Sequence, residues 1–203
     1  AAYRQVDYMI RFTEYAGHAK ELVENEKHEN YTHIVAVGGD GTVNEVGTAL
    51  CGTDIAFGVI SLGSGNGFAR HLGFSLMMSK ALKQLLQSEI TRIDVVEING
   101  YYSLNVSGLG FDAEVAHFFN KMKMRGIFSY IYSIVRMWFR YPSKRYRFKI
   151  GDKVWEEDCF ILSIANSSQY GNNARIAPKA SLRDGLFDIC ILKRPKYYQI
   201  PRF

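Results

Sequence analysis

Residues 38–47 carry the side chains of this sequence that are best suited to chemistry. They read Gly-Gly-Asp-Gly-Thr-Val-Asn-Glu-Val-Gly and directly follow the apolar run 32–37. Glycine lets the main chain come close to a bulky anion, so the amides of this loop can act as donors. We expect Thr42 to cap a helix that runs through Leu50, whose positive end faces the same anion. The pattern predicts a phosphate-binding turn between a buried strand and a helix.

Asp40 stands among these amide donors, where its carboxylate would repel a phosphate. A divalent cation or a transferable proton between the two groups removes that repulsion, and Mg²⁺ prefers one or two carboxylates together with phosphate oxygens. The loop therefore favours a magnesium nucleotide, with Asp40 meeting the metal or the acceptor hydroxyl. The alternative is a glycine-rich turn that ends a core strand, with Asp40 as a simple cap.

A second glycine-rich loop, 61–70, follows the next apolar run at 55–60. In an open α/β sheet, ligands bind beyond the carboxyl ends of neighbouring strands, so we expect both loops to close on one ligand. Ser64 offers a hydroxyl and Asn66 an amide, although Asn66 by itself also fits a helix cap. Phosphoryl transfer needs positioning and charge neutralisation more than covalent chemistry. The sequence lacks Gly-x-x-x-x-Gly-Lys, which excludes a Walker-type site.

Four motifs in a fixed order resemble the catalytic domain of the diacylglycerol kinase and sphingosine kinase family of lipid kinases. They lie at 38–46, 62–70, 105–115 and 177–188. The resemblance runs from about Thr13 to Leu192. One glycine-aspartate motif is shared with phosphofructokinases and NAD kinases, whereas the ordered set is far more specific. The resemblance implies an α/β N-terminal lobe with a parallel sheet and Gly-rich nucleotide loops, a mainly antiparallel β-rich second lobe, and ATP and Mg²⁺ as cofactors.

The resemblance also implies roles for individual residues. Asp40 is the candidate catalytic base within the chain. The nucleotide site comprises Thr13, Gly38, Gly39, Asp40, Gly41, Thr42, Asn44, Ser64, Gly65 and Asn66. A second Mg²⁺ position corresponds to 181–186, with Asp184 as the charged ligand and backbone oxygens of Ser181 and Leu186 assisting. On local grounds alone, Asp184 is a turn residue in Arg-Asp-Gly.

The sequence departs from the family pattern at both ends. The family begins with a strand that ends in an Asn-Pro-x-Ser-Gly loop, and nothing before Thr13 matches it. Near its C-terminus the family carries an acid in an Asp-Gly-Glu context, which several bacterial members use as the general base, and the sequence ends at Phe203 before such a motif. We expect these parts to be missing from the 203 residues rather than from the polypeptide, because a sheet without its opening strand exposes an edge.

The chain organisation agrees with two lobes, which we place at 1–90 and 91–203, with the boundary near 88–92. In the first lobe we expect a strand at 6–12, a helix at 14–24 and then the two strand-loop-helix units, an alternation typical of a parallel sheet. In the second lobe, Asn99-Gly100 and the turn at 149–154 predict hairpins. Further strand-like runs lie at 160–165 and 186–192.

Composition indicates in which cellular compartment the protein acts and how it can contact a membrane. With 203 residues and 47% hydrophobic composition, the chain can bury a sizeable core. The longest apolar stretch, 126–141, contains Arg136 and Arg140 and is shorter than the roughly 20 residues that span a bilayer. Three cysteines without metal-ligand spacing indicate free thiols in a reducing compartment. We expect a cytoplasmic protein that is peripheral at the inner membrane face.

The segment 121–149 holds nine basic residues, no acid and many aromatic rings. Such a segment can lie at a membrane interface, with cations on anionic head groups and rings at the boundary. The alternative is a core-packing amphipathic helix with a solvated basic edge. We expect no nucleic acid partner, because the basic residues accompany an apolar helix and no RNA-binding motif is present.

These observations favour an ATP-dependent lipid kinase that phosphorylates a hydroxyl of a diacylglycerol, phosphatidylglycerol or sphingoid-type lipid. Two alternatives stay open, an NAD kinase-like enzyme and a non-catalytic nucleotide or lipid sensor. The sequence does not decide between a monomer and a homodimer.

Overall fold

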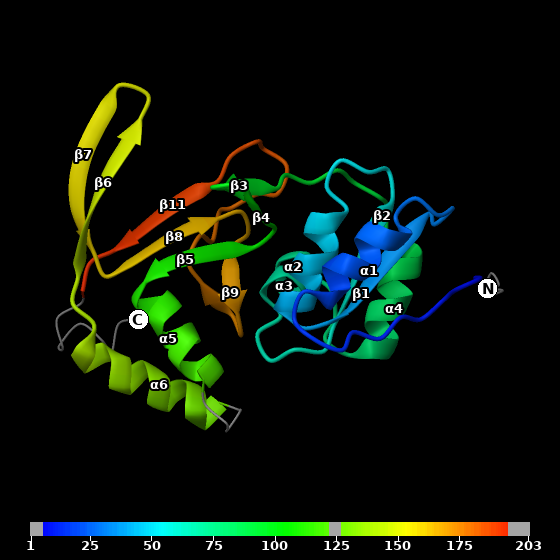
Figure 1. Cartoon of the computed structure of the whole chain (residues 1–203), viewed down its shortest axis with the longest axis horizontal. Coiled ribbons are helices and arrows are strands. Elements are labelled where there is room, and N and C mark those ends of the chain that lie inside the picture. Colours follow the sequence, from blue (N-terminus) through cyan, green and yellow to red (C-terminus); the bar gives the residue numbers. More distant parts are fainter. Residues whose placement is uncertain (1–5, 122–126, 195–203) are drawn as a thin grey trace.

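Figure 1 shows the computed structural model of the chain, which describes residues 6–121 and 127–194. An N-terminal α/β lobe lies beside a second, β-rich lobe. The elements of the first lobe are α1 (His18–Glu26), β1 (His33–Gly38), α2 (Asp40–Ala49), β2 (Ala56–Ser61), α3 (Gly67–His71) and α4 (Met78–Gln87).

The two strands of the first lobe form a parallel pair. Their register runs from His33 opposite Ala56 to Gly38 opposite Ser61. Helix α2 follows β1 directly and buries its apolar side in a core with members from both strands and three helices. That core includes Ala36, Val43, Val46, Val59 and Phe68. Because the strands are parallel and in register, the loops that follow them leave the sheet at the same edge.

Three local expectations for this lobe are wrong. Residues 6–12 form no strand and are exposed, because β1 pairs only with β2 in the described chain and an extended segment needs a partner for its backbone groups. The first helix begins at His18, after Gly17 with φ 93°, rather than at Glu14. The N-cap of α2 is Gly39, and Thr42 lies inside the helix.

The second lobe contains a three-stranded antiparallel sheet in the order β11-β8-β5. Its elements are β3 (Val96–Ile98), β4 (Tyr101–Ser103), β5 (Val106–Gly110), α5 (Phe111–Lys121), α6 (Ile127–Arg140), β6 (Lys144–Ile150), β7 (Lys153–Cys159), β8 (Ile161–Ala165), β9 (Gln169–Gly171), β10 (Ala174–Arg175) and β11 (Asp188–Leu192). Both expected hairpins are present. Asn99 and Gly100 take φ of 52° and 81° between β3 and β4, as a tight two-residue turn requires.

Helices α5 and α6 cover one end of this sheet through an aromatic core. Phe111 stacks on Phe160 with ring centroids 4.5 Å apart, and Trp138 meets Phe160 edge-on at 5.1 Å. Tyr141 completes the buried cluster. The parallel first lobe and the antiparallel second lobe confirm the predicted fold class.

Between α4 and β3 the chain contains neither helix nor strand. The predicted boundary near 88–92 falls within this connection, and the division into 1–90 and 91–203 stays a prediction. Within the described ranges, no helix has the length and apolar character needed to cross a membrane.

Candidate functional site

The two glycine loops touch each other at the carboxyl edge of the parallel strands. A Cβ added to Gly63 would lie 2.7 Å from the Cα of Gly39, so only glycine lets the two backbones approach this closely. The backbone N–H of Leu62 also donates to the carbonyl of Gly38 at 2.8 Å. The two loops that the sequence predicts to close on one ligand are therefore in direct contact.

Asp40 joins the two loops. It is the first residue of α2, and its Oδ2 accepts the backbone N–H of Asn66 at 2.7 Å. Asn66 takes a left-handed conformation with φ 55°, and its Nδ2 donates to the carbonyl of Gly63 at 2.7 Å. The Asn66 side chain therefore shapes its own loop and does not cap α3. Its buried Oδ1 has no hydrogen-bond partner among the described residues and stays free to accept a donor.

The first turn of α2 presents amides and open space. A Cβ at Gly41 would meet no protein atom within 4 Å, so packing does not explain the glycine there. A phosphate can approach the backbone at this position, where the positive end of the helix favours an anion. Thr42 packs its side chain against Gly38, where an added Cβ would lie 2.9 Å away. These observations fit the nucleotide-phosphate role predicted for the loop.

The remaining nucleotide-site residues are less closely associated with this centre. Asn44 Oδ1 accepts the backbone N–H of Leu104 at 3.1 Å, so this side chain ties α2 to the second lobe. Ser64 is exposed at the second loop. Thr13 is exposed and, among the described residues, forms no hydrogen bond with either loop. The structure thus brings 38–42 and 63–66 together without drawing Thr13 into the cluster.

The second glycine loop is also docked on the second lobe. Asn66 forms a β-bridge with Gly171, and the N–H of Asn172 donates to the carbonyl of Gly65 at 3.0 Å. A Cβ on Gly171 would lie 2.6 Å from the backbone of Gly65, and its φ of 134° also favours glycine. Arg70 Nε donates to the same Gly65 carbonyl at 3.1 Å. The loop is therefore held from both lobes.

His71 provides a further contact between the lobes at the end of α3. Its Nδ1 accepts the backbone N–H of Ser168 at 3.1 Å and lies 2.9 Å from Ser168 Oγ. An Nδ1 that accepts an N–H carries no proton itself. Burial and the nearby charge of Arg175 lower the pKa of His71, so the imidazole is held neutral at this contact.

Sequence reasoning missed a partly buried acid close to the second loop. Asp112 lies in the first turn of α5, and Tyr170 donates its hydroxyl to Asp112 Oδ2 at 2.8 Å. Gly108 leaves room for this carboxyl, because a Cβ there would overlap Oδ2 at 1.8 Å. Burial raises the pKa of Asp112, and the Tyr170 hydrogen bond only partly opposes that shift.

The same tyrosine also hydrogen-bonds to Ser163, and burial raises the pKa of Tyr170. Tyr170 precedes Gly171, so Asp112 is linked through β9 to the loop that holds Asn66. The available sequence signal was Gly-Leu-Gly-Phe-Asp, another strand that runs through glycines into a helix with an acid in its first turn.

The predicted second Mg²⁺ position lies in the turn before β11. Asp184 Oδ1 accepts the N–H of Leu186 at 3.1 Å, which is a local turn contact. Ser181 Oγ accepts the N–H of Arg183 at 3.2 Å. Asp94 lies in the connection between α4 and β3, and its Oδ2 accepts the N–H of Gly185 at 2.8 Å. In the described residues, no group of three acidic, histidine or cysteine side chains is arranged so that it could hold a metal ion.

The oxygen atoms at this turn can supply part of the ligand set of Mg²⁺. Mg²⁺ accepts one or two carboxylates and keeps several waters, so a single Asp184 with backbone oxygens of Ser181 and Leu186 is chemically compatible. Asp94 adds a second carboxylate beside the same turn. Sequence reasoning did not single it out, because its partner Gly185 lies 91 residues away.

Comparisons with known proteins match both halves of the chain. Residues 1–98 match the diacylglycerol kinase catalytic domain, and residues 105–202 match the YegS C-terminal NAD kinase beta sandwich-like domain. A "Probable lipid kinase YegS-like" of Pseudomonas syringae pv. syringae is 33% identical over 92% of this chain and 62% of its own length. A protein of the same description from Pseudomonas aeruginosa PAO1 is 32% identical over 92% of this chain and 63% of its own length.

Solved structures agree with this match. A crystal structure described as a diacylglycerol kinase from Bacillus anthracis str. Sterne has a TM-score of 0.69 and 25% identity, covering 90% of this chain and 61% of that one. The chain thus spans just over three fifths of the relatives that it matches. The resemblance drawn from the four motifs is confirmed: the first half of the chain matches the diacylglycerol kinase catalytic domain, and the second half matches the YegS-type β-sandwich domain.

Proposed function

We propose that the protein acts as an ATP-dependent lipid kinase, which transfers a phosphoryl group to a hydroxyl of a diacylglycerol, phosphatidylglycerol or sphingoid-type lipid. The observation that carries the proposal is the Asp40–Asn66 hydrogen bond, which fixes the two glycine loops around one helix N-terminus. The relatives described as probable lipid kinases support the same class of reaction. Because the chain covers only part of their length, residues outside it can contribute to the activity of the whole protein.

The residues present divide the work of phosphoryl transfer. The open backbone at Gly41 and the amides of the first turn of α2 would bind the phosphates of ATP. Asp40 would meet the metal or accept the proton of the lipid hydroxyl, while the Asn66 amide holds its carboxylate in place. Mg²⁺, when bound, supplies charge neutralisation for the transferred group. Asp184, with the backbone oxygens of Ser181 and Leu186, would hold a second Mg²⁺ that orders the loop of the second lobe.

A direct test is transfer of labelled γ-phosphate from ATP in mixed micelles, with Mg²⁺ and with excess chelator. The acceptors are diacylglycerol, phosphatidylglycerol, sphingosine and, as a soluble alternative, NAD. Label in a lipid that requires Mg²⁺ supports the proposal and names the acceptor. Label in NAD alone would replace it with the NAD kinase alternative. ATP binding without transfer to any acceptor would favour a nucleotide sensor.

The lipid acceptor places the proposed reaction at a membrane surface. We propose a cytoplasmic protein that contacts the inner membrane face peripherally, since a lipid hydroxyl must reach the glycine loops from a bilayer. Fractionation of cells that express the chain, with and without a salt wash of the membranes, tests this placement. Salt-released protein in the membrane fraction is the expected result, and protein that never sediments with membranes contradicts it.

A further inference from the structure

Helix α6 has two faces of different character. The inward face packs against the aromatic core of the second lobe through Ile134, Met137 and Trp138. The outward face bears three large apolar side chains that stay half or more exposed, namely Tyr132 at 50%, Val135 at 52% and Phe139 at 79%. Exposed apolar side chains that gather on one face mark an interaction surface more often than singly scattered ones do.

Two arginines share this outward face. At about 100° of rotation per residue, the exposed apolar side chains and the arginines together span about 140° of the helix circumference. Arg136 lies over the rings of Phe118 and Tyr132, at 5.5 and 6.0 Å from their centroids, and donates to the Tyr132 hydroxyl at 2.8 Å. Arg140 is exposed in the last turn. Within the described ranges, neither arginine forms an ion pair with a carboxylate.

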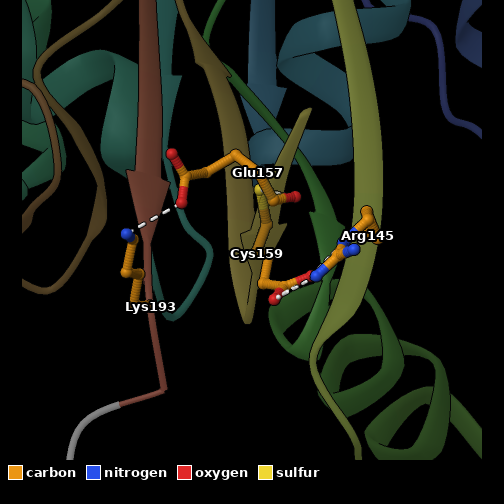
Figure 2. A network of polar contacts seen from close by, with 5 residues as sticks. Arg145, Glu157, Cys159 and Lys193 are labelled. Carbon is orange, nitrogen blue, oxygen red and sulfur yellow. Dashed lines mark hydrogen bonds and ion pairs between the residues drawn. The ribbon is translucent and has the colours of Figure 1, made fainter. Parts of the chain in front are cut away.

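The basic strand β6, at the C-terminal end of the basic run, pairs with a strand that carries acids. Strand β6 carries four cations, but its partner β7 carries Glu156, Glu157 and Asp158. Arg145, which Figure 2 labels, pairs with Asp158 through two hydrogen bonds of 2.9 and 3.1 Å. Arg147 stands opposite Glu156 in register. Lys193 on the chain after β11 pairs with Glu157 at 2.8 Å, also drawn in Figure 2.

Helix α6 and the β6–β7 hairpin therefore differ in the balance of their charges. In Figure 1 the β6–β7 hairpin projects from the top of the second lobe, while α6 runs along its lower edge. The hairpin combines the cations of β6 with the acids of β7, which weakens its net field beyond a Debye length of about 8 Å at physiological salt. The face of α6 combines rings with two arginines that form no ion pair within the described residues, and of these Arg136 is half-buried and Arg140 is exposed. This is the composition of a helix that lies in a membrane interface.

We propose that the outward face of α6, made of Tyr132, Val135, Arg136, Phe139 and Arg140, docks the protein on a bilayer that contains anionic phospholipid. The rings would enter the head-group boundary while the guanidinium groups bind phosphates of the lipids. The occupant is a bilayer because the face joins cations with apolar side chains along one stripe, whereas Arg145 and Arg147 of β6 stand opposite Asp158 and Glu156. The inference rests on the proposed lipid-kinase function, since that function requires a lipid acceptor.

The test is co-sedimentation of the full chain with phosphatidylcholine vesicles that either contain or lack phosphatidylglycerol, at low and at high salt. We expect binding only with phosphatidylglycerol, weakened by salt. R136Q/R140Q should reduce the partition about thirtyfold, which corresponds to about 1 kcal/mol for each cation. V135S/F139S removes the apolar part of the face without touching the aromatic core, so it should also reduce binding while the melting temperature stays that of the parent.

The matched control is R147Q/K149Q, which removes the same number of cations from β6. This variant should bind vesicles like the parent. An equal loss from the control and from R136Q/R140Q would overturn the assignment to α6, as would binding that ignores phosphatidylglycerol and salt. If V135S/F139S changes the oligomeric state in sedimentation equilibrium but leaves vesicle binding intact, the face is an interface between copies and the membrane proposal is wrong.

A second readout separates failure of this inference from failure of the kinase proposal. Phosphoryl transfer is measured with a short-chain, monomeric lipid acceptor and with the same acceptor class in vesicles. Docking through α6 predicts that R136Q/R140Q keeps its turnover on the monomeric acceptor and loses turnover on vesicles. Equal loss on both acceptors contradicts docking. No transfer by the parent, together with intact charge-dependent vesicle binding, instead contradicts the kinase proposal alone.

Discussion

Asp40 Oδ2 accepts the backbone N–H of Asn66 at 2.7 Å, so one carboxylate couples the first turn of α2 to the second glycine loop. The bond spans 26 residues of sequence and defines the geometry between the loops that follow β1 and β2. It also fixes where the second oxygen of Asp40 can act. The same side chain therefore has a structural role and a proposed chemical role, and these roles can be separated by substitution.

Asp40→Asn should lower phosphoryl transfer by about 100-fold or more while leaving the melting temperature close to that of the parent. The amide keeps an oxygen that can accept the Asn66 N–H, but it neither binds Mg²⁺ as a carboxylate does nor accepts a proton. Asp40→Ala, the comparison, removes the acceptor as well and should cost about 1–3 kcal/mol of stability. Turnover and thermal unfolding of both variants provide the measurement. If the turnover of Asp40→Asn stays within a factor of a few of the parent, Asp40 does not have the proposed chemical role.

Gly63→Ala and Gly41→Ala should have opposite effects, although each adds a single methyl group. At Gly63 the new Cβ would lie 2.7 Å from the Cα of Gly39, so the loops must separate at a cost of about 1–3 kcal/mol. At Gly41 the Cβ meets no protein atom, and alanine in a helix is favoured by about 0.5–1 kcal/mol.

The two alanine variants are compared by urea unfolding and by ATP binding. If phosphates approach the backbone at Gly41, G41A is expected to be at least as stable as the parent but to bind ATP more weakly. Unchanged ATP affinity in G41A would show that the nucleotide binds elsewhere.

Sequence patterns predicted the parts of this site that depend on neighbouring residues. A glycine loop after an apolar run is a local signal, so both loops and both hairpins were predicted correctly in position. The strand predicted at 6–12 is absent because a strand needs a partner for its backbone hydrogen bonds, and an apolar pattern does not show whether a partner is present. The prediction that Thr42 caps α2 is wrong because Gly39, with extended φ and ψ, is the N-cap and the helix begins at Asp40.

Other features depend on contacts between distant segments and carry no local signal. Asp112 acquires its environment from Tyr170, which lies 58 residues later. The acids that face the basic strand β6 come only after the hairpin turn, so the run 121–149 looked uniformly basic when taken alone. The lysines and arginines of such a segment cannot be assigned to a surface until its partner strand is known.

Mg²⁺ should raise the melting temperature of the chain in the absence of nucleotide, through the turn that contains Asp184. A ligand that binds only the folded state stabilises it by about 2.7 kcal/mol at 100 times its dissociation constant. Asp184→Ala should remove the shift, while Asp152→Ala, in the exposed β6–β7 turn, should keep it. A parent without a magnesium-dependent shift, or an Asp184→Ala variant that retains all of it, contradicts the second metal position.

Stability should fall in the pH range just below 6.5 because of His71. Its folded-state pKa is lowered from 6.5, chiefly by burial and then by the charge of Arg175. The unfolded chain therefore takes up this proton first as the pH falls, and the free energy of unfolding decreases until the pH reaches the folded-state pKa. Protonated Nδ1 can no longer accept the Ser168 N–H.

The measurement is urea unfolding across this pH range for the parent and for His71→Asn. The variant should show a shallower pH dependence. His117→Asn, at an exposed position of α5, controls for the removal of an imidazole. Parallel pH profiles of the parent and His71→Asn would mean that another group causes the loss.

Asp112→Asn should stabilise the protein at neutral pH and leave its stability at low pH almost unchanged. Burial raises the folded-state pKa of Asp112 above 3.8, so the folded protein binds this proton more tightly than the unfolded chain does. As the pH rises from the unfolded-state pKa through the folded-state pKa, that contribution to stability is lost. Asparagine stays neutral throughout and still accepts the Tyr170 hydroxyl.

Tyr170→Phe provides the opposing variant. It removes the donor that favours the ionised carboxylate, so it should raise the pKa of Asp112 further and deepen the loss of stability toward neutral pH. Chemical unfolding at a series of pH values, for the parent and both variants, measures the two slopes. If Asp112→Asn destabilises the protein by the same amount at every pH, the ionised carboxylate does not carry a burial cost, and Asp112 would instead act through a contact that the amide cannot replace.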